Sequence, residues 1–371
     1  MWWAAWTRQR SGGWPRAWPA LGGLLAAQPA LAVTPPEDRA EALLHVYDGA
    51  GTRATGPAVL VRKSLADRVQ LSGSLYVDMV SNASIDVVTT ASPYRERRTA
   101  ADLALQGQVR DATLKLSLAG SSEPDYRVRS VALDATQEVF GGMTTLNLGF
   151  TRSADDVGKT GSPEFADAAT HWQWRVGATQ VLSPRWLATA ALEVLADDGF
   201  LGSPYRVARV FGAAVPERTP RTRTGRALAL GLRGDVQGVG VLRADYRYFW
   251  DTWEVHAHTL EFGAARRFGP DWTAEAALRW HRQDAALFYS DNAQAETRYV
   301  SRNRQLATFS NLGLQAKLSH AVTRIGADKP VWLTGSYEFK RLSYRDFTDL
   351  RTGEPYAHNA HLLQLYVAVD F

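Results

Sequence analysis

Hydrophobic and polar residues alternate with a period of two along most of this chain. Successive side chains of a β-strand point to opposite faces, so the pattern predicts strands with one apolar and one polar face. Helical spacing fits these segments poorly. The clearest examples are RVQLSGSLYVDM (68–79), ATLKLSLAG (112–120), ALALGLRGD (227–235) and WTAEAALRWH (272–281).

The links between predicted strands fall into two kinds, which broadly alternate. Tight links such as Arg110-Asp111 and Ser183-Pro184-Arg185 carry turn residues, whereas the links at 81–97, 153–170, 196–224, 283–304 and 342–358 are mostly long and polar. Links 48–56, 122–125 and 250–255 are shorter, 122–125 is brief for an outer loop, and 319–330 is long for an inner turn. The predicted strands are 41–47, 57–64, 68–80, 98–109, 112–121, 126–137, 143–152, 171–182, 186–195, 225–235, 239–249, 256–267, 272–282, 305–318, 331–341 and 360–371.

Short turns alternating with longer loops are typical of a transmembrane antiparallel β-barrel. We therefore predict an all-β fold of about 16 strands, with long extracellular loops, short periplasmic turns and both termini on the periplasmic side. Fourteen strands remain possible if two are misread. A soluble β-sandwich or β-solenoid also alternates, but its buried faces rarely coincide with alternating turn lengths.

The last ten residues, LLQLYVAVDF, lie in the final predicted strand and are amphipathic. A sheet in hydrocarbon satisfies its backbone polar groups only by closing, so this strand should pair with the first. A terminal aromatic after alternating hydrophobes also resembles the signal by which bacterial outer-membrane barrels are recognised for assembly. The residues of this membrane-assembly signal are Leu363, Leu365, Val367, Val369 and Phe371.

The first 32 residues have the layout of a secretory signal peptide: a basic start, an apolar stretch and Ala30-Leu31-Ala32 as a cleavage signal. We expect residues 33–371 to form the barrel domain. Outside the leader, 39 basic side chains face 38 acidic ones, which argues against nucleic acid as a partner. The chain has no cysteine and, beyond residue 32, no apolar run of about 18 residues that would predict a membrane helix.

Aromatic residues are expected to gather at both membrane interfaces. Trp186, Trp272 and Phe371 fall at the predicted periplasmic ends of strands. A second group falls near the other end: Trp172, Trp174, Tyr248, Trp250, Trp280, Tyr337 and Phe339.

Alternation places charged side chains of both signs on the face that should line the lumen. Folding the hairpin 256–282 about its turn sets Glu261 opposite Arg279, where opposite charges support pairing. These residues could line an ion-selective channel, or they could form a purely structural charge network. The lumen candidates are Asp78, Lys115, Gln173, Arg175, Glu193, Arg233, Arg243, Asp245, Arg247, Glu261, Glu275, Arg279, His281, Glu338 and Lys340.

Other chemistry receives little support. The apolar, β-branched link 81–97 could plug the pore or merely extend a strand. His256 and His258 share a face with Leu260 and Phe262, and two imidazoles without a third ligand do not predict a metal site. No G-x-S-x-G elbow marks a hydrolase, so we predict neither catalytic residues nor a cofactor.

The stretch ASIDVVTTASPY (83–94) resembles the hallmark of an uncharacterised family of proteobacterial outer-membrane barrels. Further matches lie in GPAVLVRKSLAD, SLYVDMVS, DDGFLGSPYRVAR, DYRYFWDTWEVHAHTLEFG and ALFYSD, so the resemblance covers nearly the whole mature chain. It implies the class and a Gram-negative outer-membrane location, and it implies no chemistry. It also hints at flavin-transfer and thioredoxin-like neighbours in the cell envelope.

The favoured function is therefore a porin-like, non-enzymatic pore or transport component with a charged lumen. The alternative is a plugged barrel that acts as a scaffold for a periplasmic redox or flavin-linked partner, and an integral outer-membrane hydrolase ranks below both. The expected partners are outer-membrane lipid and the barrel-assembly machinery. Substrate, oligomeric state and plugging stay open.

Overall fold

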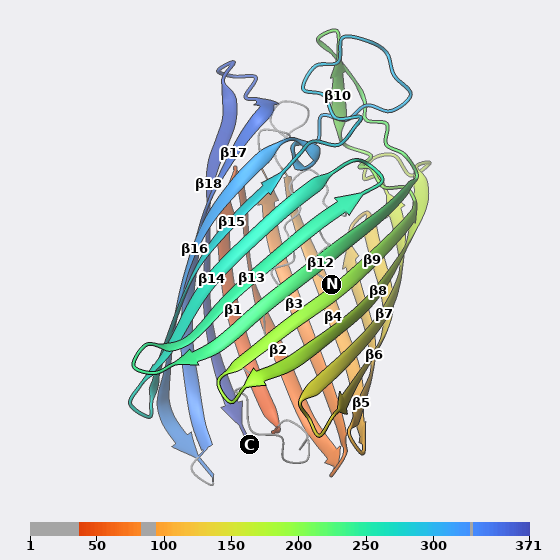
Figure 1. Cartoon of the computed structure of the whole chain (residues 1–371). Coiled ribbons are helices and arrows are strands. Elements are labelled where there is room, and N and C mark those ends of the chain that lie inside the picture. Colours follow the sequence, from red (N-terminus) through yellow and green to blue (C-terminus); the bar gives the residue numbers. More distant parts are fainter. Residues whose placement is uncertain (1–36, 83–93, 327–328) are drawn as a thin grey trace.

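The computed structural model describes residues 37–82, 94–326 and 329–371, and sixteen of its strands close into one antiparallel barrel (Figure 1). The predicted signal peptide lies outside these residues. A short hairpin, β10 (Val207–Val210) with β11 (Ala213–Pro216), stands apart from the barrel. The barrel strands are β1 (Arg39–Gly49), β2 (Thr52–Ala66), β3 (Val69–Asn82), β4 (Tyr94–Val109), β5 (Ala112–Glu123), β6 (Tyr126–Val139), β7 (Thr144–Gly158), β8 (Ala166–Ser183), β9 (Trp186–Gly199), β12 (Thr222–Val236), β13 (Gly240–Asp251), β14 (His256–Phe268), β15 (Trp272–Gln283), β16 (Phe309–Ile325), β17 (Lys329–Thr348) and β18 (Pro355–Asp370).

The first and last strands join, as the terminal pattern predicts. β1 pairs with β18 from Arg39↔Asp370 to Gly49↔Ala360. The Arg39 guanidinium lies 3.0 Å from the Asp370 carboxylate, and the backbone N–H of Phe371 donates to the carbonyl of Asp38 at 2.9 Å. The sheet therefore has no free edge, and the predicted 16-strand fold is confirmed.

The wall has an apolar outer face and a polar inner face. Leu114, Leu116 and Leu118 of β5 are all exposed, as are Leu363 and Leu365 of β18. Such rows of exposed aliphatic side chains around a closed sheet match the band that contacts lipid in membrane barrels. Among the described residues, no helix is long and apolar enough to cross a membrane.

Longer connections gather at one end of the barrel, which we call the loop end; the other is the turn end. The longest loop-end connections are 200–221 and 284–308, and the second contains the short 3-10 helix η1 (Arg304–Leu306). At the turn end, β4 and β5 are joined by two residues, and β8 and β9 likewise. The C-terminus lies at the turn end (Figure 1), and β1 begins beside it, because Arg39 pairs with Asp370.

Several connections are shorter than predicted because strands continue past the apolar band. The link 48–56 is in fact a two-residue turn in which Ala50 (φ 54°) and Gly51 (φ 75°) both have positive φ, as a tight hairpin turn requires. The prediction that 319–330 is a long inner connection is wrong, because β16 runs to Ile325. η1 occupies the start of predicted strand 305–318, and that strand begins at Phe309.

Candidate functional site in the barrel interior

The predicted lumen residues all lie on the inner face of the wall. Each follows or precedes an outward side chain on its strand; Lys115, for example, lies between Leu114 and Leu116, and Arg175 lies between Trp174 and Val176. The side chains near mid-wall remain partly accessible: 38% for Arg175, 33% for Asp134 and 35% for both Arg243 and Asp245. The inner wall thus bounds solvent-accessible space, while the role of these residues in passage stays a prediction.

Most of these inward charges form ion pairs between strands. Arg243 lies 2.7 Å from Glu261, Lys317 lies 2.9 Å from Glu275, and Arg247 lies 3.7 Å from Glu193. Within β17, Lys340 lies 2.9 Å from Glu338. Unpaired buried charges are costly, so pairing between strands lets the interior of the barrel carry many charges.

Some pairs reach across an intervening strand where that strand has a small residue. Arg175 of β8 donates to Asp134 of β6 at 2.6 Å, and Gly149 of β7 lies between them. A Cβ at Gly149 would lie 2.7 Å from the Arg175 Nη2, so a larger residue there would displace the pair. Asp134 and Lys317 are inward by alternation but were not among the predicted residues.

The hairpin about residues 269–271 places Glu261 in register with Arg279, as predicted. The carboxylate of Glu261 nevertheless forms its ion pair with Arg243 of the preceding strand. Register alone therefore identifies the facing residue but leaves the choice of partner to side-chain geometry.

Near the loop end the inner face is densely packed. His45 lies 2.8 Å from Asp78, and His281 lies 2.9 Å from the Thr259 hydroxyl. Another histidine, His171, lies between two carboxylates, with Nδ1 2.6 Å from Asp197 and Nε2 3.1 Å from Asp155. Because all three histidines are buried, this end of the interior is much less accessible than mid-wall.

The loops fold inward over one sector of the wall. Inward residues Leu195, Ala227 and Phe249 form an apolar core with Trp253 of connection 252–255 and Leu306 of connection 284–308. Leu201 brings connection 200–221 into the same core. The burial of this apolar surface fixes the three connections against strands β9, β12 and β13.

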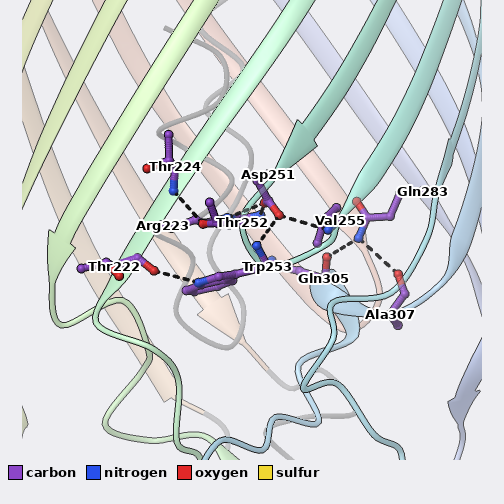
Figure 2. A network of polar contacts seen from close by, with 10 residues as sticks. All are labelled: Thr222, Arg223, Thr224, Asp251, Thr252, Trp253, Val255, Gln283, Gln305 and Ala307. Carbon is purple, nitrogen blue, oxygen red and sulfur yellow. Dashed lines mark hydrogen bonds and ion pairs between the residues drawn. The ribbon is translucent and has the colours of Figure 1, made fainter.

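Asp251, the last residue of β13, organises this loop core (Figure 2). Its Oδ1 accepts hydrogen bonds from the backbone N–H groups of Trp253 at 2.8 Å and Val255 at 3.0 Å. Its Oδ2 accepts from Nε of the buried Arg223 at 2.6 Å, and that guanidinium lies 4.4 Å from the Trp253 ring. One carboxylate thus fixes both a turn and a buried cation.

Connection 284–308 has a second anchor, on strands β16 to β18. Phe309, Tyr344, Phe347 and Tyr356 form an apolar cluster against which Tyr289 packs. The Tyr289 hydroxyl donates to the carbonyl of Asp346 at 2.9 Å, and burial raises the pKa of this phenol, which keeps the donor protonated. The connection therefore contacts both the β13–β14 and the β17–β18 sides of the wall.

A third cluster attaches the β10–β11 hairpin to the same connection. Ala208 and Val210 pack against Val300, and Arg302 is held by Asp291 at 2.7 Å. Sequence reasoning identified neither this loop assembly nor its anchors. The predicted plug at 81–97 falls mainly on residues 83–93, which lie outside the described residues.

The fold and its two faces define a closed β-barrel with an apolar exterior, a charged interior and inward-folded loops. The sequence profile of a family described as "Protein of unknown function (DUF3570)" matches residues 32–330, and the chain belongs to this family. The predicted membership of an uncharacterised family is thereby confirmed. No curated protein sequence matches the chain.

Solved structures of similar shape include a receptor, a channel and an outer membrane secretin. The chain is similar to the siderophore receptor PirA from Pseudomonas aeruginosa (10% identity, 89% of this chain and 80% of that chain, TM-score 0.44). It is also similar to the CymD monoaromatic hydrocarbon channel (10% identity, 90% of this chain and 88% of that chain, TM-score 0.44). A bacterial polysaccharide outer membrane secretin is similar as well (8% identity, 90% of this chain and 98% of that chain, TM-score 0.47). Similarity at this level carries no argument about function.

Proposed function

We propose that this protein is an outer-membrane β-barrel that passes small polar or charged solutes through its lumen and has no enzymatic activity. The observation that carries this proposal is the inner wall of partly accessible, paired charges at mid-height. A barrel of 16 strands is wide enough for an aqueous channel unless loops fill it. Connections 200–221 and 284–308 then narrow the passage at the loop end.

The outer face supports the membrane location. All seven aromatic residues predicted near the loop end lie outward, and Trp172 stacks on Trp174 with ring centroids 6.3 Å apart. Amphipathic rings at this level are typical of the membrane–water interface. The loop end would face the outside of the cell, and the turn end the periplasm.

The proposal is tested by single-channel recording in planar bilayers. We expect the purified barrel to give a stable conductance. Replacing Arg243 and Arg247 by Gln removes two inward cations and leaves Glu261 and Glu193 without their observed partners, so the reversal potential in a salt gradient should shift toward cation selectivity. Arg226→Gln is the matched control, because Arg226 is exposed on the outer face of β12.

Two results would contradict this function. An unchanged reversal potential in the double variant would remove Arg243 and Arg247 from the conducting path. A correctly folded barrel that gives no conductance would reject the pore and favour the scaffold for a periplasmic redox or flavin-linked protein, for which co-purification is the direct assay.

A further inference from the structure

Four arginines lie on the outer face of the wall at the loop end of β4, β6 and β7. They alternate with inward residues such as Val128 and Asp155, which are buried. Outward charges on a membrane barrel are unusual because the side chains at this face otherwise contact lipid. The four exposed residues are Arg97, Arg127, Arg129 and Arg152.

A groove crosses the outer face beside two of these arginines. Its lining includes Arg129 and Arg152 together with the small residues Ala101, Gly120 and Ala154. Strand pairing sets Ala101, Gly120, Arg129 and Ala154 in one row across β4 to β7. The small side chains beside Arg129 leave the hollow open.

The next row toward the turn end is apolar. Leu103, Leu118 and Val131 are in register and lead to Arg152 on β7. All four residues line the groove. The groove therefore has a cationic border and an apolar floor on adjacent rows.

The aromatic girdle gives the depth of this groove in the membrane. The Arg152 guanidinium lies 5.1 Å from the Trp172 ring, and Phe150 packs beside Trp172 and Trp174. An arginine on the lipid face costs about 2–4 kcal/mol at the midplane but only about 0–1 kcal/mol near the interface. The arginines thus lie where lipid headgroups meet acyl chains.

The patch has excess positive charge. On the outer faces of the described parts of β4 to β8, Asp156 is the single carboxylate, and it lies 2.8 Å from Arg129. Both partners of this pair are largely exposed, at 77% and 58%. One acid against four guanidinium groups leaves the surface complementary to an anion.

We propose that this groove binds a phosphorylated lipid of the leaflet at the loop end. Arg129 and Arg152 would contact the phosphate, because a guanidinium donates to phosphate oxygens through two parallel N–H groups. An acyl chain of the same molecule would lie over Leu103, Leu118 and Val131. The barrel would then hold one lipid at a fixed position, independently of whether its lumen conducts.

Native mass spectrometry of the full-length barrel in detergent tests this assignment, with hexa-acylated bisphosphorylated lipid A as the probe. We expect the affinity for lipid A to fall at least about tenfold in Arg129→Gln/Arg152→Gln, because two charge-assisted contacts to phosphate are lost. A similar fall is expected when the wild-type barrel receives lipid A without its phosphates. Arg226→Gln/Arg341→Gln removes two outward arginines of β12 and β17 and should bind as the wild type does.

Several outcomes would overturn the proposal. Equal binding by the double variant, or of the dephosphorylated lipid, would overturn the proposal. Displacement of the lipid by millimolar inorganic phosphate would show that free phosphate suffices and would overturn the assignment to lipid. If the double variant fails to fold, Ala154→Leu fills the groove with both arginines retained and should give the same loss; intact binding by Ala154→Leu would also reject the groove.

Discussion

Replacing Asp251 by alanine is expected to detach the loop core from the inner wall. The change leaves the buried Arg223 guanidinium without its carboxylate and removes the acceptor for two backbone N–H groups. Breaking one partner of a buried ion pair costs about 3–5 kcal/mol. We expect the midpoint of urea unfolding to fall and connections 252–255 and 284–308 to become sensitive to protease while the strands stay protected.

The same variant tests whether the loops narrow the passage. If they do, single-channel conductance should increase and become noisier as the core loosens. Thr252→Ala is the matched control: Thr252 is the next residue, and its exposed hydroxyl accepts one hydrogen bond, from Thr224 at 3.0 Å. Equal protease sensitivity in Asp251→Ala and Thr252→Ala would contradict the anchoring role of Asp251.

Placing an arginine on the lipid-facing side of β5 is expected to destabilise the barrel strongly. Leu116 is exposed and lies in register with two further outward leucines, Leu105 and Leu133. Leu116→Arg should lower the free energy of unfolding in lipid vesicles by about 2–4 kcal/mol if this row lies at the bilayer midplane. Tryptophan fluorescence during urea titration measures the change.

The neighbouring residue gives the control for the opposite face. Ser117→Arg adds the same side chain to the inner wall, where charges are already accommodated, and should change stability by less than about 1 kcal/mol. The orientation of β5 would be wrong if Ser117→Arg were the more damaging change. Equal losses in detergent and in lipid would argue that Leu116 does not contact the bilayer.

The strand count and the two faces followed from the sequence because a period of two reports which side of a wall each residue occupies. Leu363 and Leu365 predicted a membrane-facing final strand, and the pairing of β18 with β1 confirms it. Strand ends were less predictable. β16 continues through Ser319 and Arg324, where the hydrogen-bonded ladder persists but the apolar alternation has ended.

The candidate site was likewise predictable only in part from the sequence. Alternation placed Arg243, Glu261 and Arg279 on the inner face, yet only side-chain reach decided that Arg243 is the partner of Glu261. Asp251 lies within the family-like stretch DYRYFWDTWEVHAHTLEFG, yet alternation gave no sign of its anchoring role, because a carboxylate at a strand end usually faces solvent. Its role arises when residues 223, 253 and 255 meet around it.

The sequence by itself determined the apolar exterior and the charged interior, because both depend on the local rule that alternate residues face opposite sides. It also determined that the sheet closes, because a lipid-facing sheet must pair every backbone polar group. The tertiary structure decided which charges pair, how the loops fold into the mouth and where outward arginines border a groove. These features join residues far apart in the chain, such as Arg175 and Asp134 or Tyr289 and Asp346. Their contacts depend on strand stagger and side-chain geometry, which no local periodicity encodes.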